Sequence, residues 1–111
     1  MINKINNCIL SAVAEDVDYF YFDKREGLVI KYNKPKDDMR IAYFIAGQNF
    51  LYNFIKNEFY NDFKSKNINK LLVDFTNNKI TLTKQPLKPL NYELEKNSLT
   101  EQLYKIINNC Q

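Results

Sequence analysis

Apolar residues near the start of the chain recur at spacings of three and four, which is typical of a helix with one buried face. The residues with this spacing are Ile2, Ile5, Ile9, Leu10 and Val13. They predict a helix from about residue 2 to residue 15. The next segments, Val17–Asp23 and Leu28–Asn33, are rich in β-branched and aromatic residues and flank Gly27, which suits a short hairpin loop. We therefore expect a helix followed by a β-hairpin.

The middle of the chain begins with a polar loop around Pro35, which ends the hairpin. Met39–Ala46 is a nearly continuous apolar run, and such a run is compatible with a strand or with the first turns of a helix. We assign it to a third strand. Beyond Gln48, large apolar residues at helical intervals predict a long helix that ends near Lys64. These residues are Phe50, Leu51, Phe54, Ile55, Phe59 and Phe63.

The second half of the chain predicts another hairpin. Leu71–Thr76 and Ile80–Lys84 flank Asn77 and Asn78, and asparagine tolerates the left-handed backbone conformation of tight turns. In Ile80–Lys84 apolar residues alternate with threonines, so one face of that strand should be in contact with water. The prolines at 86 and 89 predict an extended connection from there to about residue 96.

The end of the chain carries the signals of a helix start. Ser98 and Glu101 have the spacing of a capping box, in which each side chain bonds a backbone N–H near the helix start. The apolar residues after them form one stripe, which predicts a C-terminal helix that begins at Ser98. These residues are Leu99, Leu103, Ile106, Ile107 and Cys110.

The predicted element order is α-β-β-β-α-β-β-α. Short turns between neighbouring strands favour a small, mainly antiparallel sheet of about five strands packed against helices, which is an α+β fold. The 111 residues contain no repeat or linker, and this length is typical of one core. We expect residues 1–111 to form a single globular domain.

The residue types exclude most catalytic chemistry. The chain has no histidine, so it lacks the usual general base and every Ser-His or Cys-His pair. Its two glycines are too few for a phosphate-binding loop. Carboxylate pairs such as Asp37 and Asp38, or Asp16 and Asp18, and the triplet Asp62–Lys64 remain as alternatives, but solvated side chains explain each of them. We predict that the protein is not an enzyme and has no catalytic residues, metal or cofactor.

Tyrosine is the sharper feature, because four of the eight tyrosines lie in the predicted strands of the first half. Alternation in Val17–Asp23 places Val17, Tyr19 and Tyr21 on one side of the strand and Asp18, Phe20 and Phe22 on the other. One face then packs on helices, and the other is either covered as well or binds a partner. Tyrosines beside charged residues are typical of protein-binding surfaces. The predicted partner-binding residues are Asp16, Asp18, Tyr19, Tyr21, Tyr32, Asp37 and Asp38.

Charge and compartment refine this hypothesis. A net charge of +3 is small for a nucleic-acid binder, although the lysine-rich stretch from Lys64 to Lys88 is the most suitable segment for phosphates. No apolar run approaches the roughly 18 residues of a membrane span, and Asn6 and Asn7 interrupt the only candidate signal peptide. Cys8 and Cys110 match no metal or redox spacing. We expect two reduced thiols in a cytoplasmic protein that does not bind membranes.

A compact domain with mixed charge, many tyrosines and no catalytic apparatus is typical of immunity proteins encoded beside bacterial toxins. We therefore predict a protein-binding inhibitor, an immunity protein or antitoxin, that binds a cognate toxin domain or another protein target. The alternatives are a phage protein that acts against host defences and a small nucleic-acid-binding protein. No residue motif in the chain distinguishes among these classes.

Overall fold

The computed structural model describes residues 17–32, 38–84, 88–95 and 98–110, with the backbone alone for residues 32 and 38–47. The predicted helix at 2–15 and Cys8 lie outside these ranges. Within them, the elements in chain order are β1 (Val17–Asp23), β2 (Gly27–Tyr32), α2 (Asp38–Ser65), β3 (Ile68–Asp74), β4 (Lys79–Lys84), β5 (Leu90–Glu93) and α3 (Leu99–Asn109).

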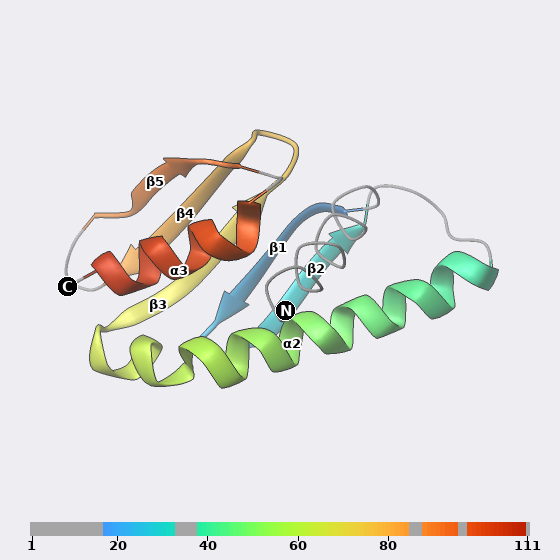
Figure 1. Ribbon diagram of the computed structural model, residues 1–111, viewed down its shortest axis with the longest axis horizontal. Helices are drawn as coiled ribbons and strands as arrows, with labels where there is room; N and C mark the ends of the chain where they lie inside the picture. Colours follow the sequence, from blue (N-terminus) through green and yellow to red (C-terminus); the bar gives the residue numbers. More distant parts are fainter. Residues whose placement is uncertain (1–16, 33–37, 85–87, 96–97, 111) are drawn as a thin grey trace.

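The five strands form one sheet in the order β2-β1-β3-β4-β5 (Figure 1). Each pair of neighbours is antiparallel. The chain leaves the β1–β2 hairpin, passes through α2 and returns beside β1 as β3, so β1 is an inner strand although it comes first. The predicted α+β class with a small antiparallel sheet is confirmed.

The identity of one strand was predicted incorrectly. Residues Met39–Ala46 form the first turns of α2 and not a strand. The fifth strand is instead β5, Leu90–Glu93, in the segment that we expected to be an extended connection. An apolar run without a period does not separate a strand from a helix, and here it continues the helix that the pattern beyond Gln48 indicates.

Turn residues take the conformations that their types favour. Gly27 has φ 81° in the first hairpin, and Asn78 has φ 55° in the turn between β3 and β4. Asn67, with φ 56°, follows the end of α2 and lets β3 begin at Ile68, earlier than the predicted Leu71. Both predicted hairpins are therefore confirmed, with shifted strand ends.

The helix start at Ser98 is confirmed, but the predicted capping box is not. The Ser98 side chain makes no capping hydrogen bond to α3, and its hydroxyl lies 3.3 Å from the Glu95 carboxylate. The backbone N–H of Ser98 donates to the Glu95 carbonyl oxygen instead. The chain therefore folds back on the residues before the helix, and Ser98 is directed towards them.

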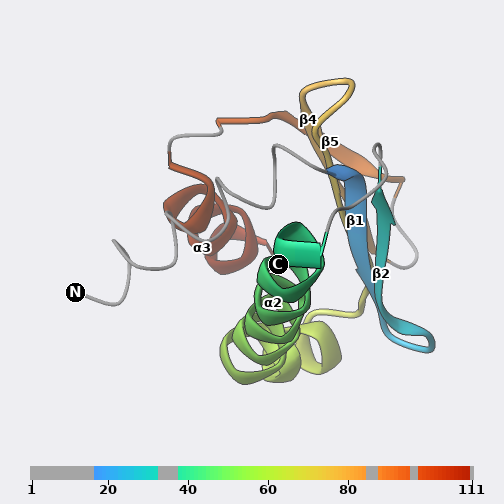
Figure 2. The same ribbon diagram turned by 90° about the vertical axis from the view of Figure 1, so that its right-hand side faces the viewer.

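Both described helices lie on the same side of the sheet (Figure 2). The hydrophobic core fills the space between the helices and the sheet. It is formed by the apolar residues that the patterns of the strands and helices predicted to be buried. Its largest fully buried side chains are Phe20, Leu51, Ile55, Phe59, Phe63, Ile68, Leu71, Ile80, Leu82, Leu99 and Leu103. The alternation of β4 is confirmed, because Ile80 and Leu82 are buried while Thr81 and Thr83 are half-buried.

The start of β1 departs from simple alternation. The register shifts between Val17 and Tyr19, which leaves Asp18 as an extra residue, and Val17 is buried in the core with Phe20. The prediction that Val17 shares a face with the two tyrosines is therefore wrong. The predicted separation of Phe20 and Phe22 from Tyr19 and Tyr21 is confirmed.

Candidate functional site

The sheet surface opposite α2 and α3 is not covered by any described helix (Figure 2). We call it the open face. Residues directly opposite one another on neighbouring strands share a face, so the register defines its members from Tyr19, Tyr21 and Asp23 outward. They are Tyr19, Tyr21, Asp23, Val29, Lys31, Lys70, Leu72, Asp74, Lys79, Thr81, Thr83, Asn91 and Glu93.

Two tyrosine rings of β1, the strand next to the edge strand β2, are stacked on the open face. The ring centroids of Tyr19 and Tyr21 are 6.3 Å apart and the planes differ by 15°. Lys70 of β3 holds its Nζ 3.9 Å from the Tyr21 ring centroid, and the Tyr21 hydroxyl donates to the Glu26 carboxylate at 3.1 Å. Three contacts therefore fix the Tyr21 ring, so a partner would lose little conformational entropy in ordering it.

The same hydrogen bond affects ionisation of the phenol. Acceptance by Glu26, partial desolvation and the charge of Glu26 together raise the pKa of Tyr21 above its ordinary value. Tyr21 is therefore a neutral hydrogen-bonding group at physiological pH.

Charges of both signs surround the tyrosines in register. Lys70 lies opposite Asp23, and Asp74 lies opposite Lys79, which in turn lies opposite Glu93. Burial alone would raise the pKa of Asp74, but hydrogen bonds from the side chain and backbone of Asn77 outweigh it and lower this pKa. Asp74 is therefore ionised but nearly buried, with its carboxylate held by Asn77. A mixed surface of this kind suits a protein partner better than a polyanion.

The structure describes only part of the predicted binding set. Tyr19 and Tyr21 lie together on the open face, whereas Asp16 and Asp37 lie outside the described residues. Tyr32 ends β2 and Asp38 begins α2, and the description of both is limited to their backbone. The Asp18 carbonyl oxygen accepts hydrogen bonds from the N–H groups of Phe75 (2.9 Å) and Thr76 (3.2 Å). Asp18 therefore joins β1 to the turn after β3.

The lysine-rich stretch from Lys64 to Lys88 does not form one surface. Lys66 pairs with Asp62 at 3.4 Å and donates to the Ile107 carbonyl oxygen at 2.8 Å. Lys70 contacts Tyr21 on the open face, and Lys84 is only 4% exposed. These lysines are distributed among different sides of the molecule, which argues against a single phosphate-binding track.

The acidic side chains of the described residues do not gather into a metal-binding group. No group of three or more Cys, Asp and Glu side chains in the described part of the chain could hold a metal ion. The triplet Asp62–Lys64 lies on α2, as predicted, and Asp62 is engaged by Lys66 in the next turn.

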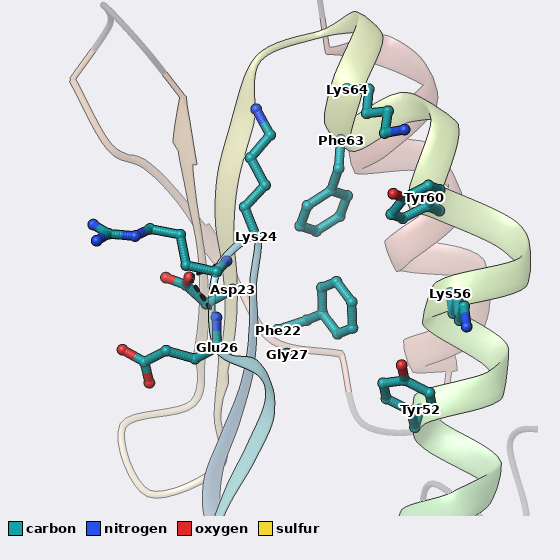
Figure 3. Close-up of a pocket in the computed structure, with 11 residues that line it drawn as sticks. Phe22, Asp23, Lys24, Glu26, Gly27, Tyr52, Lys56, Tyr60, Phe63 and Lys64 are labelled. Atoms are coloured by element: carbon teal, nitrogen blue, oxygen red, sulfur yellow. Dashed lines mark hydrogen bonds between the residues drawn. The ribbon is translucent and has the colours of Figure 1, made fainter.

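A second feature is a groove of about 470 Å³ between the β1–β2 hairpin and α2 (Figure 3). We call it the hairpin groove. Its hairpin wall is Phe22–Gly27, and its helix wall is formed by Tyr52, Lys56, Tyr60, Phe63 and Lys64. Tyr52 is 40% exposed and Tyr60 is 45% exposed, which makes them prominent among the large hydrophobic side chains at the surface.

Sequence reasoning missed this groove because it treated the polar side of the long helix as a solvated face. The signal was present in the spacing. Tyr52, Lys56, Tyr60 and Lys64 alternate at intervals of four, which places them on one ridge of the helix. The other wall of the groove, Phe22–Gly27, is far from this ridge in the sequence, so only the tertiary fold brings the two walls together.

Within the described ranges, neither helix has the length and apolar character that a membrane crossing requires. Comparison of the chain with family models, with curated proteins and with solved structures found no match. The functional argument therefore depends on the open face and the hairpin groove themselves.

Proposed function

We propose that this protein is a cytoplasmic protein-binding inhibitor, an immunity protein that neutralises a cognate toxin by seating it on the open face. The observation that carries the proposal is the stacked pair Tyr19 and Tyr21 on a sheet surface that no described helix covers. The two rings are outside the hydrophobic core, so folding alone does not explain their size.

The physical support comes from the cost of binding. A tyrosine offers a large amphipathic area with few rotatable bonds, and Tyr21 is already held by Lys70 and Glu26. The charges of both signs around the rings would give a protein partner its orientation, because opposite charges would have to meet in one register. A nucleic acid would meet the carboxylates of Asp23 and Glu93 on the same surface, which oppose its binding.

The test is a growth experiment in a bacterial host. The open reading frame next to the gene is expressed with and without this protein, and culture density is followed. We expect arrest without the protein and growth with it. A harmless neighbour, or toxicity that the protein leaves unchanged, would refute the inhibitor role.

Variants then test the surface. The double variant Tyr19→Ala and Tyr21→Ala should restore arrest, whereas Lys105→Ala on the exposed side of α3 should protect as well as the wild type. The variants are compared at equal soluble amounts with matched far-UV circular dichroism. Full protection by the tyrosine double variant would remove the open face from the proposal.

A further inference from the structure

The hairpin groove combines an aromatic floor with a charged rim. Phe63 of α2 meets Phe22 of β1 edge to face at 5.4 Å and 87°, and Phe22 also contacts Tyr52 at 6.3 Å. Both phenylalanines point into the space between the hairpin and α2 in Figure 3. Phe22 and Phe63 are only 7% and 1% exposed, so the ring surface that a ligand would contact is mainly that of Tyr52 and Tyr60 on the helix wall.

The charge that faces the groove is positive. The hairpin contributes two carboxylates, but Asp23 accepts the backbone N–H groups of Arg25 (2.7 Å) and Glu26 (3.2 Å), and Glu26 accepts the Tyr21 hydroxyl. Figure 3 shows the Glu26 side chain directed away from α2. These hydrogen bonds leave both carboxylates charged, but the lining also contains four cationic side chains, Lys24, Arg25, Lys56 and Lys64, so its net charge is positive.

The lysines of the groove are available to a ligand. Within the described residues, no ion pair holds Lys24, Lys56 or Lys64, since the salt bridge found there joins Lys66 to Asp62. Lys56 and Lys64 instead lie over the rings of Tyr52 (5.6 Å) and Tyr60 (4.5 Å). Lys56 and Lys64 are eight residues apart on α2, about 12 Å at ~1.5 Å per residue, so separate carboxylates of one ligand would each approach an ammonium group without displacing an existing carboxylate.

We propose that the hairpin groove binds an acidic, partly apolar segment of a protein chain in extended conformation. The ridge from Tyr52 to Lys64 is about 18 Å long at ~1.5 Å per residue. An extended peptide rises about 3.3 Å per residue, so roughly six residues follow the ridge. Their carboxylates meet the lysines, and their apolar side chains lie against the tyrosine rings.

The ring contacts favour a peptide over a single-stranded nucleic acid. Bases bind aromatic side chains by stacking on an open ring face. Lys56 and Lys64 already occupy one face of each tyrosine ring. The helix ridge offers only lysines, which suit single carboxylates, and the one arginine of the lining, Arg25, belongs to the hairpin wall. The inference goes beyond the proposed toxin role and does not require the open face.

The test uses a fluorescein-labelled peptide, Glu-Asp-Leu-Glu-Asp-Leu, whose anisotropy is followed as the full chain is added. The matched control peptide replaces each acid with its amide. We expect saturable binding of the acidic peptide that weakens with added salt, and at least tenfold weaker binding of the amide peptide. No binding of the acidic peptide, or equal binding of both peptides, would overturn the proposal.

Charge reversal locates the site. The double variant Lys24→Glu and Lys64→Glu should weaken peptide binding roughly tenfold, because two attractive contacts become repulsive. The double variant Lys88→Glu and Lys105→Glu has the same net charge but changes exposed lysines outside the groove, so it should bind within about twofold of the wild type. Equal loss in both variants would mean that net charge alone attracts the peptide, and the groove would be rejected. Tighter binding of a labelled oligothymidine of equal charge, lost in the groove variant, would replace the peptide by a nucleic acid.

Discussion

Phe59 offers the strongest test of the packing between the two helices and the sheet. Its side chain is 1% exposed, and its ring meets Phe54 at 5.6 Å and Tyr104 of α3 at 5.3 Å, both edge to face. A buried phenylalanine removes about 150–250 Å² from water, and burial stabilises by about 25 cal/mol per Å². Alanine keeps part of that area and a cavity replaces the ring, so Phe59→Ala should lower the free energy of unfolding by about 4 kcal/mol.

The adjacent residue is a matched control. Tyr60 is 45% exposed and points out of the core, so Tyr60→Ala should cost less than about 1 kcal/mol. Phe59→Leu restores most of the volume but loses both ring contacts, and it should fall between them at about 1–2 kcal/mol. Urea denaturation followed by far-UV circular dichroism measures all three. If Phe59→Ala and Tyr60→Ala cost the same, α2 does not present the face that the structure assigns to it.

Three further predictions concern other parts of the fold. Asp74→Ala leaves the Asn77 backbone and side-chain N–H groups without their acceptor and should lower the free energy of unfolding by about 1–3 kcal/mol at neutral pH. Because the pKa of Asp74 is lowered in the folded state, the difference in stability between wild type and variant should shrink as pH falls below about 4. Urea titrations that give the same difference at every pH would contradict these hydrogen bonds. Gly27→Ala should cost about 1–2 kcal/mol, entirely through the backbone, since φ is +81° and an added Cβ would meet no atom within 4 Å; an unchanged urea midpoint would refute this. Cys110 is a free and buried thiol, and the variant Cys8→Ser leaves it as the one thiol of the chain. In this variant Cys110 should react with a thiol reagent slowly in buffer and rapidly in denaturant. Equal rates would show that Cys110 is accessible in the folded protein.

The fold could be predicted where burial repeats with a clear period. The apolar stripe from Phe50 to Phe63 is compatible only with a helix, and the alternation in Ile80–Lys84 is compatible only with a strand. The structure confirms both elements. Met39–Ala46 lacks a period, so the choice between strand and helix was open, and α2 extends through it. Leu90–Glu93 follows Pro89, and none of its residues is fully buried, so only pairing with β4 makes it a strand.

The site could be predicted only in part for a related reason. Alternation along β1 is local, and it correctly separated Tyr19 and Tyr21 from Phe20 and Phe22. Which face the helices cover depends on how α2 returns the chain to β3. The charge pairs of the open face also bring together residues that are distant in sequence. The same is true of Lys24 and Lys64, which lie on facing walls of the hairpin groove. No local sequence pattern predicts these contacts.

The inner position of β1 in the sheet has a consequence for the order in which the protein folds during synthesis. Its inner neighbour β3 follows only after β2 and the whole of α2, and Tyr21 pairs with Leu72 across that interval. The β1–β2 hairpin, which is marginally stable alone in water, must therefore wait while roughly 40 further residues are made, which takes about 2–8 s at ordinary translation rates. By contrast β3, β4, β5 and α3 are consecutive and can assemble as they emerge. Pairing of β1 with β3 is then the late step, and until it occurs the nascent chain exposes the side of β1 that carries Phe20 and Phe22.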